Sequence, residues 1–183
     1  ILLLMICLLW RDERDIASVN TLTGLYQKAI LYLNKPFTQK PSPTARIEAV
    51  IIQIGKVALQ GLLEGEIYLK KDWIEDEQVD EEMLAESFEI GLCSQEEGIV
   101  IGEELVIFIH KTFQEFCAAK YLDDLLKNNL ALFESQLSKC MLSMYNIDFL
   151  LRFCCGLRVE LANAVLTHVM KKLSNAGQSW RLD

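Results

Sequence analysis

Residues 108 to 119 read FIHKTFQEFCAA and place His110 at the corner between an apolar run and a helical pattern. The run before it, Leu105 to Ile109, is rich in β-branched residues and predicts a strand. Helical spacing begins directly after the histidine and predicts a helix from about 111 to 127. The apolar positions of this helix, which we expect to serve as packing, are Phe113, Phe116, Cys117 and Tyr121. Because the chain has only two histidines, the one at this corner is a candidate functional residue.

The helix N-terminus beside His110 is suited to an anion. Thr112 and Glu115 form the T-x-x-E pattern of a capping box, which predicts that the helix begins within two residues of His110. Free backbone N–H groups and the positive end of the helix dipole favour negative charge there. Imidazole can donate a hydrogen bond to a phosphate oxygen. For Gln114 and Glu115 we expect only capping or domain-contact roles, and for His168, on a later helix, a surface or partly buried position.

Helices are also expected before this corner. The opening run ILLLMICLLW, residues 1 to 10, predicts a buried helix, and residues 19 to 34 predict a second one that stops at Asn34 and Pro36. Residues 44 to 64 predict a long helix whose fraying end is marked by Gly61 and Gly65. The inward positions expected on these two longer helices are Leu22, Leu25, Tyr26, Ala29, Leu33, Ile47, Val50, Ile51, Ile54, Val57, Ala58 and Leu62.

Between these helices and His110 the pattern includes strands. EIYLKKDWI predicts a short extended stretch leading into a turn of helix, and DEEMLAESFEIG predicts a helix that starts with acidic residues and ends at Gly91. Two runs, Ile99 to Ile101 and Leu105 to Ile109, are joined by Gly102 and two glutamates and predict a hairpin. Later helices are expected near 130–143, 146–156 and 159–173. The predicted fold is mainly α, with a winged-helix domain that has a small β-hairpin wing, flanked by helical-domain segments.

Acidic residues are concentrated in one segment of the chain. Residues 64 to 104 contain fifteen Asp or Glu against Lys70 and Lys71, and the whole chain has a net charge of −8. The helix that would enter a DNA groove, DEEMLAESFE, has no basic residue, so a phosphate backbone would be repelled. We therefore expect no nucleic-acid partner, and either basic partners or water at this acidic face.

The cysteines and the apolar run at the start of the sequence indicate in which cellular compartment the protein is expected. Six cysteines lie in apolar settings: Cys7, Cys93, Cys117, Cys140, Cys154 and Cys155. They lack the spacing of a zinc site, so we expect no metal and interpret them as core thiols of a cytoplasmic protein, with Cys154 and Cys155 on different sides of a helix. The ten apolar residues at the start are too few for a membrane span of ~20 residues and lack the flanks of a signal peptide. We expect no membrane span.

Five segments, in order, resemble the region that follows the nucleotide-binding core in NACHT proteins of the NOD-like receptor family, which are STAND-type ATPases. They are ILLLMICLLW, TLTGLYQKAILYL, IGKVALQGLLEGEIYLKKDWI, ESFEIGLCSQEEG and FIHKTFQEFCAAKYL. The most specific element is the string F-x-H-x-x-x-Q-E-F-x-A-A. The resemblance implies the end of a first helical domain and a linker at 1–40, a winged-helix domain at 41–127 and the start of a second helical domain at 128–183.

The resemblance also implies a role for His110. In inactive members of the family, the histidine of this string contacts the phosphates of ADP bound in the neighbouring ATPase core. ADP or ATP is then the cofactor, held mainly by a NACHT core, and the partners are that core, leucine-rich repeats in cis and further copies of the protein on activation. The implied process is innate immune or cell-death signalling. These 183 residues contain no G-x-x-x-x-G-K-[ST] loop, so we expect enzymatic activity only in a NACHT NTPase parent.

Two other classes of function compete with this one. A purely structural helical scaffold or protein-interaction domain without nucleotide contact is the main alternative. A cysteine hydrolase that pairs His110 with Cys93 or Cys117 is disfavoured. Cys117 lies two helical turns beyond His110, ~10 Å away and outside the reach of a catalytic hydrogen bond.

Overall fold

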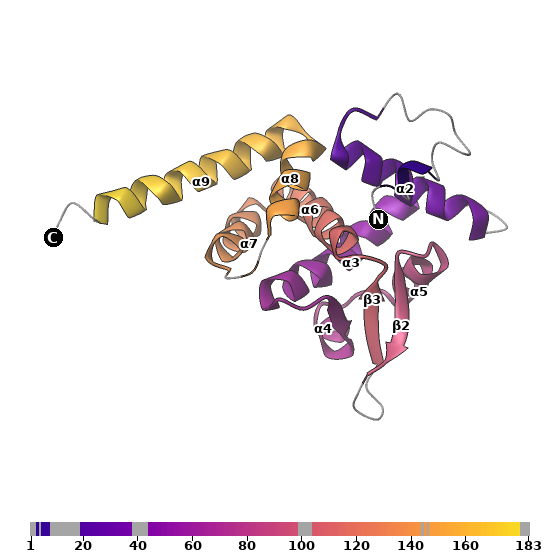
Figure 1. Ribbon diagram of the computed structural model, residues 1–183. Helices are drawn as coiled ribbons and strands as arrows, with labels where there is room; N and C mark the ends of the chain where they lie inside the picture. Colours follow the sequence, from indigo (N-terminus) through magenta and orange to yellow (C-terminus); the bar gives the residue numbers. More distant parts are fainter. Residues whose placement is uncertain are drawn as a thin grey trace.

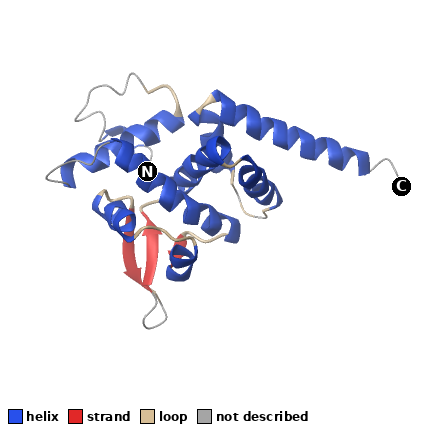
Figure 2. Cartoon of the chain, turned by 180° about the vertical axis from the view of Figure 1, so that it is seen from behind, coloured by secondary structure: helices blue, strands red, loops and turns tan. Residues whose placement is uncertain are grey.

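The chain is mainly helical, with a three-stranded antiparallel sheet at one end, in the computed structural model (Figures 1 and 2). The structure describes residues 3, 5–7, 19–37, 44–98, 104–143, 145 and 147–179, apart from the side chains of 34–37, 173 and 175–179. The helices are α2 (Leu22–Phe37), α3 (Thr44–Glu64), α4 (Lys71–Asp76), α5 (Glu81–Glu89), α6 (Lys111–Asn128), α7 (Leu130–Leu142), α8 (Asp148–Leu157) and α9 (Val159–Ser179). The strands are β1 (Tyr68–Lys70), β2 (Cys93–Glu97) and β3 (Glu104–Phe108). The predicted mainly α class is confirmed.

Helices α3 and α6 cross at the centre of the molecule and pack closely on each other (Figure 1). A Cβ atom at Gly55 of α3 would lie 2.2 Å from the carbonyl oxygen of Cys117 in α6, so only a glycine permits this approach. Every residue of α6 from Thr112 to Ala119 is buried. Because α6 is covered on all sides over these turns, the other elements are arranged around it.

The two long N-terminal helices largely match their predicted patterns. Helix α3 has the predicted bounds, and its expected inward positions are buried. Gly65 follows it at φ 78°, and the N–H of Glu66 donates to the carbonyl of Gly61 at 2.8 Å, which closes the helix end. Gly61 itself is buried within the helix, so its predicted place in a fraying end is wrong. Helix α2 continues to Phe37, past the predicted stop at Asn34.

The sheet has the strand order β1-β3-β2 and corrects the predicted hairpin. The second predicted strand matches β3, but the first paired strand is Cys93–Glu97. The run Ile99 to Ile101, predicted as that strand, lies outside the described residues. In β2 only Cys93 is buried and the other four residues are polar and exposed, so the sequence lacks the apolar alternation that marks a strand. Pairing with β3 therefore defines β2, from Cys93 opposite Phe108 to Glu97 opposite Glu104.

The predicted buried helix at the start of the chain lies mostly outside the described residues. Residues 3 and 5 to 7 are helical, with Met5 buried and Leu3 and Ile6 exposed. Cys7 is also exposed, as is Cys155, so these two are not the core thiols that we predicted; the other four cysteines are buried. Cys154 is buried and Cys155 exposed, as expected for neighbours on different sides of a helix.

The C-terminal helices build outward from α6. Helix α8 packs against α6 and α2, and α9 packs against α8 and α7 (Figure 1). Rings of α2, α6 and α8 meet between these helices: the centroids of Tyr26 and Phe153 are 4.8 Å apart, and those of Phe116 and Phe153 are 5.4 Å apart at 87°. No helix in the described part of the chain has both the length and the apolar character required to span a bilayer.

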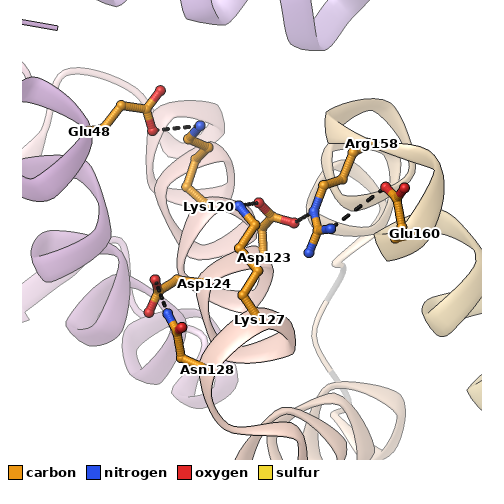
Figure 3. Close-up of polar contacts among 8 residues, drawn as sticks. All are labelled: Glu48, Lys120, Asp123, Asp124, Lys127, Asn128, Arg158 and Glu160. Atoms are coloured by element: carbon orange, nitrogen blue, oxygen red, sulfur yellow. Dashed lines mark hydrogen bonds and ion pairs between the residues drawn. The ribbon is translucent and has the colours of Figure 1, made fainter. Parts of the chain in front are cut away.

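Ion pairs also join α6 to α3 and to the junction of α8 and α9 (Figure 3). Lys120 of α6 contacts Glu48 of α3 at 2.6 Å. Asp123 of α6, whose side chain is 9% exposed, contacts both Lys127 and Arg158, and Arg158 also lies 3.6 Å from Glu160. Since a buried carboxylate is costly without a cation, Arg158 fixes the junction of α8 and α9 against α6.

Replacing Arg158 with alanine should therefore destabilise the fold. We expect a loss of about 1–3 kcal/mol in the free energy of unfolding, because Asp123 would keep only Lys127 as its cation. Urea denaturation followed by circular dichroism measures this loss. Glu160→Gln is the matched control: its side chain is 70% exposed, so its removal should change the free energy by less than ~0.5 kcal/mol. Equal effects of the two substitutions would contradict this account.

Candidate functional site

His110 is the N-cap of α6. Its backbone is extended, at φ −165° and ψ 146°, and the helix begins at Lys111. The ring nitrogen Nδ1 accepts a hydrogen bond from the backbone N–H of Thr112 at 3.2 Å. The helix therefore begins next to His110, as predicted, but the predicted capping box of Thr112 and Glu115 is wrong. Strand β3 ends at Phe108, two residues before this cap.

A chain of hydrogen bonds connects His110 to α2. The hydroxyl of Tyr26 donates to Thr112 Oγ1 at 2.5 Å, and Thr112 Oγ1 lies 2.8 Å from His110 Nδ1. Burial raises the pKa of Tyr26, so its hydroxyl keeps the proton that it donates. The hydrogen of the Thr112 hydroxyl is then directed to His110.

This arrangement determines which nitrogen of His110 carries hydrogen. Nδ1 accepts from the Thr112 backbone N–H, and it lies 2.8 Å from the oxygen of the Thr112 hydroxyl. An imidazole nitrogen that accepts carries no hydrogen, so in the neutral ring the hydrogen is on Nε2. His110 is exposed, as is Lys111 beside it. The corner thus combines an imidazole, an exposed lysine and a helix N-terminus. The N–H groups of Thr112 and Phe113 are not free as predicted, because both donate to His110, so the positive end of the helix dipole is what favours an anion here.

Gln114 and Glu115, for which capping or domain-contact roles were expected, lie in the buried part of α6. Gln114 Nε2 donates to the carbonyl of Glu66 at 3.0 Å and approaches that of Ala58 at 3.4 Å. A Cβ at Gly61 would lie 2.8 Å from the same nitrogen. Gln114 therefore ties α6 to the C-terminal end of α3, which is a contact role and not a cap.

Glu115 is buried, which the sequence analysis did not predict. It is 2% exposed, and its Oε2 has no hydrogen-bond partner among the described residues. Burial raises the pKa of Glu115 to about 7; Lys111 lowers it and Asp148, at the start of α8, raises it. Its burial could have been predicted from the sequence, because Glu115 is a charged residue at an inward position of an otherwise apolar helix face.

The stability of the fold should therefore fall as pH rises through about 7. The pKa of Glu115 is higher in the folded chain than in the unfolded one. The protonated carboxyl therefore contributes fully to the free energy of unfolding at a pH below the pKa of the unfolded chain, and this contribution is lost at a pH above the pKa of the folded chain. Glu115→Gln should match the parent at pH 4 and exceed it at pH 8 by on the order of 2 kcal/mol. Urea unfolding across this pH range measures the difference. Glu134→Gln, on the exposed surface of α7, should leave the pH dependence unchanged; if Glu115→Gln also leaves it unchanged, the assignment is wrong.

The thiols proposed for a hydrolase are poorly placed for that chemistry. Cys93 and Cys117 are 3% and 0% exposed. Burial raises the pKa of Cys93 to about 12 and that of Cys117 well above its usual value, so both remain protonated. His168, the second histidine, is half-buried, and its Nε2 lies 3.1 Å from Ser138 Oγ between α9 and α7. This matches the position expected for it.

Comparison with protein-family models gives no match for this chain, and comparison with curated proteins gives none either.

The Tyr26–Thr112–His110 connection can be tested by a double-mutant cycle. Thr112→Val leaves the buried Tyr26 hydroxyl without an acceptor and should cost about 1–3 kcal/mol of folding free energy. Tyr26→Phe in the same chain removes the stranded hydroxyl, so the double variant should be more stable than the sum of the two single changes predicts, by on the order of 1 kcal/mol. Thr112→Ser, which keeps the oxygen, is the control. Strictly additive effects would show that the two residues are uncoupled.

Proposed function

We propose that this chain is the regulatory part of a NOD-like receptor ATPase and that His110 donates a hydrogen bond from Nε2 to a phosphate of ADP held by a NACHT core. The observation that carries the proposal is the hydrogen-bonded His110 at the N-terminus of α6. It offers a donor where the helix end also favours negative charge. The resemblance of the string F-x-H-x-x-x-Q-E-F-x-A-A supplies the identity of the anion.

The order of elements supports a winged-helix domain at 41–127. Helix α3, strand β1, helices α4 and α5, the β2–β3 hairpin and helix α6 follow one another in that sequence. The predicted order was three helices, a hairpin wing and a further helix, and the additional strand β1 pairs with β3 at the edge of the sheet away from β2. On this proposal residues 1–40 end a first helical domain and 128–183 begin a second.

The proposed mechanism is a nucleotide-dependent latch. ADP would bridge the NACHT core and this chain, and exchange for ATP would change the phosphate contact at His110. A ligand shifts a conformational equilibrium only by the difference in its contacts with the two states, and His110 supplies such a difference. The released domain would then rotate as a rigid body and permit homo-oligomerisation, with leucine-rich repeats acting in cis, in cytoplasmic immune or cell-death signalling.

His110→Ala in the full-length protein tests the proposal. A hydrogen bond to a charged group contributes enough that its loss should weaken ADP retention about tenfold or more. The purified parent should carry ADP and be monomeric, whereas the variant should lose nucleotide and form larger assemblies. Chromatography of nucleotide released by denaturation and light scattering of the eluted protein measure the two properties.

His168→Ala is the matched control, because it removes the other histidine from a site between α7 and α9. It should retain ADP as the parent does. If His110→Ala also retains ADP and remains monomeric, the nucleotide contact is absent and the scaffold alternative is the better description.

A further inference from the structure

A groove with an apolar floor lies between α4, α5 and the sheet. Its volume is about 360 Å³. The floor is built by half-buried or buried side chains that come from four different segments: Ile74, Val79, Leu84, Phe88 and Val106. A volume at the lower end of the range for ligand pockets, ~300–1,000 Å³, suits one or two inserted side chains.

The rim of this groove is acidic. Glu75, Glu81 and Glu104 line it and are exposed, and Lys71, the cation of the lining, lies 3.6 Å from Glu104. The groove belongs to the segment from residue 64 to 104, which holds fifteen acidic residues against two lysines. An anionic rim around an apolar floor attracts cations and excludes phosphates.

Cations of α3 neutralise a different set of carboxylates. Arg46 contacts Glu82 at 3.1 Å and Glu86 at 2.9 Å. Lys56 likewise contacts Glu77 at 2.9 Å. These pairs attach α5 and the end of α4 to α3, on the inner side of the acidic segment. Within the described residues no ion pair involves Glu75 or Glu81, so these rim carboxylates are available to a cation from outside.

The cleft between α7 and α9 is larger, about 640 Å³, but the charges of its lining do not indicate which kind of partner would bind there. Its lining carries both signs of charge, from Glu134, Lys171 and Lys172. By contrast, the smaller groove combines an apolar floor with a rim in which Lys71 is outnumbered by Glu75, Glu81 and Glu104, and that combination specifies the chemistry of a partner.

We propose that the α4–α5–sheet groove binds a cationic amphipathic segment of another protein, which inserts one bulky apolar side chain onto the floor and pairs flanking Lys or Arg residues with Glu75, Glu81 and Glu104. The apolar insertion supplies the affinity, and the charges select the partner and speed its association. Nucleic acids and anionic lipid surfaces are repelled by the same rim. His110 does not line this groove, so the proposal is independent of the nucleotide contact.

Fluorescence anisotropy with the 183-residue chain tests the proposal. The probe is a labelled peptide in which a central Leu-Trp pair is flanked by Lys and Arg on both sides. We expect saturable binding that weakens as salt is raised. A peptide with Ser in place of Leu and Trp, and one with Glu in place of Lys and Arg, should each bind at least ~10-fold more weakly, because each lacks one of the two required features.

Two groove variants locate the binding. Glu75→Lys with Glu81→Lys should weaken binding of the probe at least ~10-fold, whereas Glu134→Lys with Glu160→Lys, which changes the net charge equally at exposed sites elsewhere, should have little effect. Gln95→Trp, at an exposed lining position, should obstruct the groove and also weaken binding. Circular dichroism checks that each variant is folded. Equal binding of the Ser peptide, equal weakening by the two double variants, or preferential binding of duplex DNA would overturn the proposal.

Discussion

The contact between α3 and α6 at Gly55 is the constraint on which the other packing depends. The backbone of α6 at Cys117 lies where any side chain on Gly55 would be, so the two helix axes approach more closely than side-chain packing normally allows. This approach buries α6 from Thr112 to Ala119. A second close approach of the two helices occurs at Gly61, where the side chain of Gln114 in α6 occupies the space that a Cβ atom would need. From there Gln114 donates a hydrogen bond to the carbonyl of Glu66, just after α3. The Lys120–Glu48 ion pair adds a polar contact along the same interface (Figure 3).

The buried position of α6 also determines the geometry of its N-terminus. Strand β3 is connected to α6 through Ile109 and His110, and Thr112, in the first turn of the helix, bonds to Tyr26 of α2. The orientation of the His110 ring is thus fixed by a residue far earlier in the sequence. A surface histidine would ordinarily sample several rotamers, but the contacts of Nδ1 with the backbone N–H and the hydroxyl of Thr112 restrain this ring.

The uneven charge of the chain has two structural consequences. Carboxylates of the acidic segment that face α3 are paired with Arg46 and Lys56 and contribute to packing. Carboxylates on the other side of this segment line an apolar groove, where Glu104 contacts Lys71 and no ion pair within the described residues involves Glu75 or Glu81. The same composition that makes a nucleic-acid role unfavourable therefore defines a surface suited to a cationic protein segment. The two candidate sites, the His110 corner and this groove, lie at different parts of the fold and need not act together.

The sequence by itself determined the helices with strong apolar periodicity, because burial of one face imposes a period that can be read locally. This is why α3 has its predicted bounds, and why α5 begins in acidic residues at Asp80 and ends near Gly91. The sequence also indicated that His110 adjoins a helix N-terminus. Strand β2 could not be predicted, because its residues are mostly polar and only pairing with β3 holds them extended. The cap, the Tyr26 connection and the buried Glu115 depend on residues brought together from distant parts of the chain, so only the tertiary structure decided them.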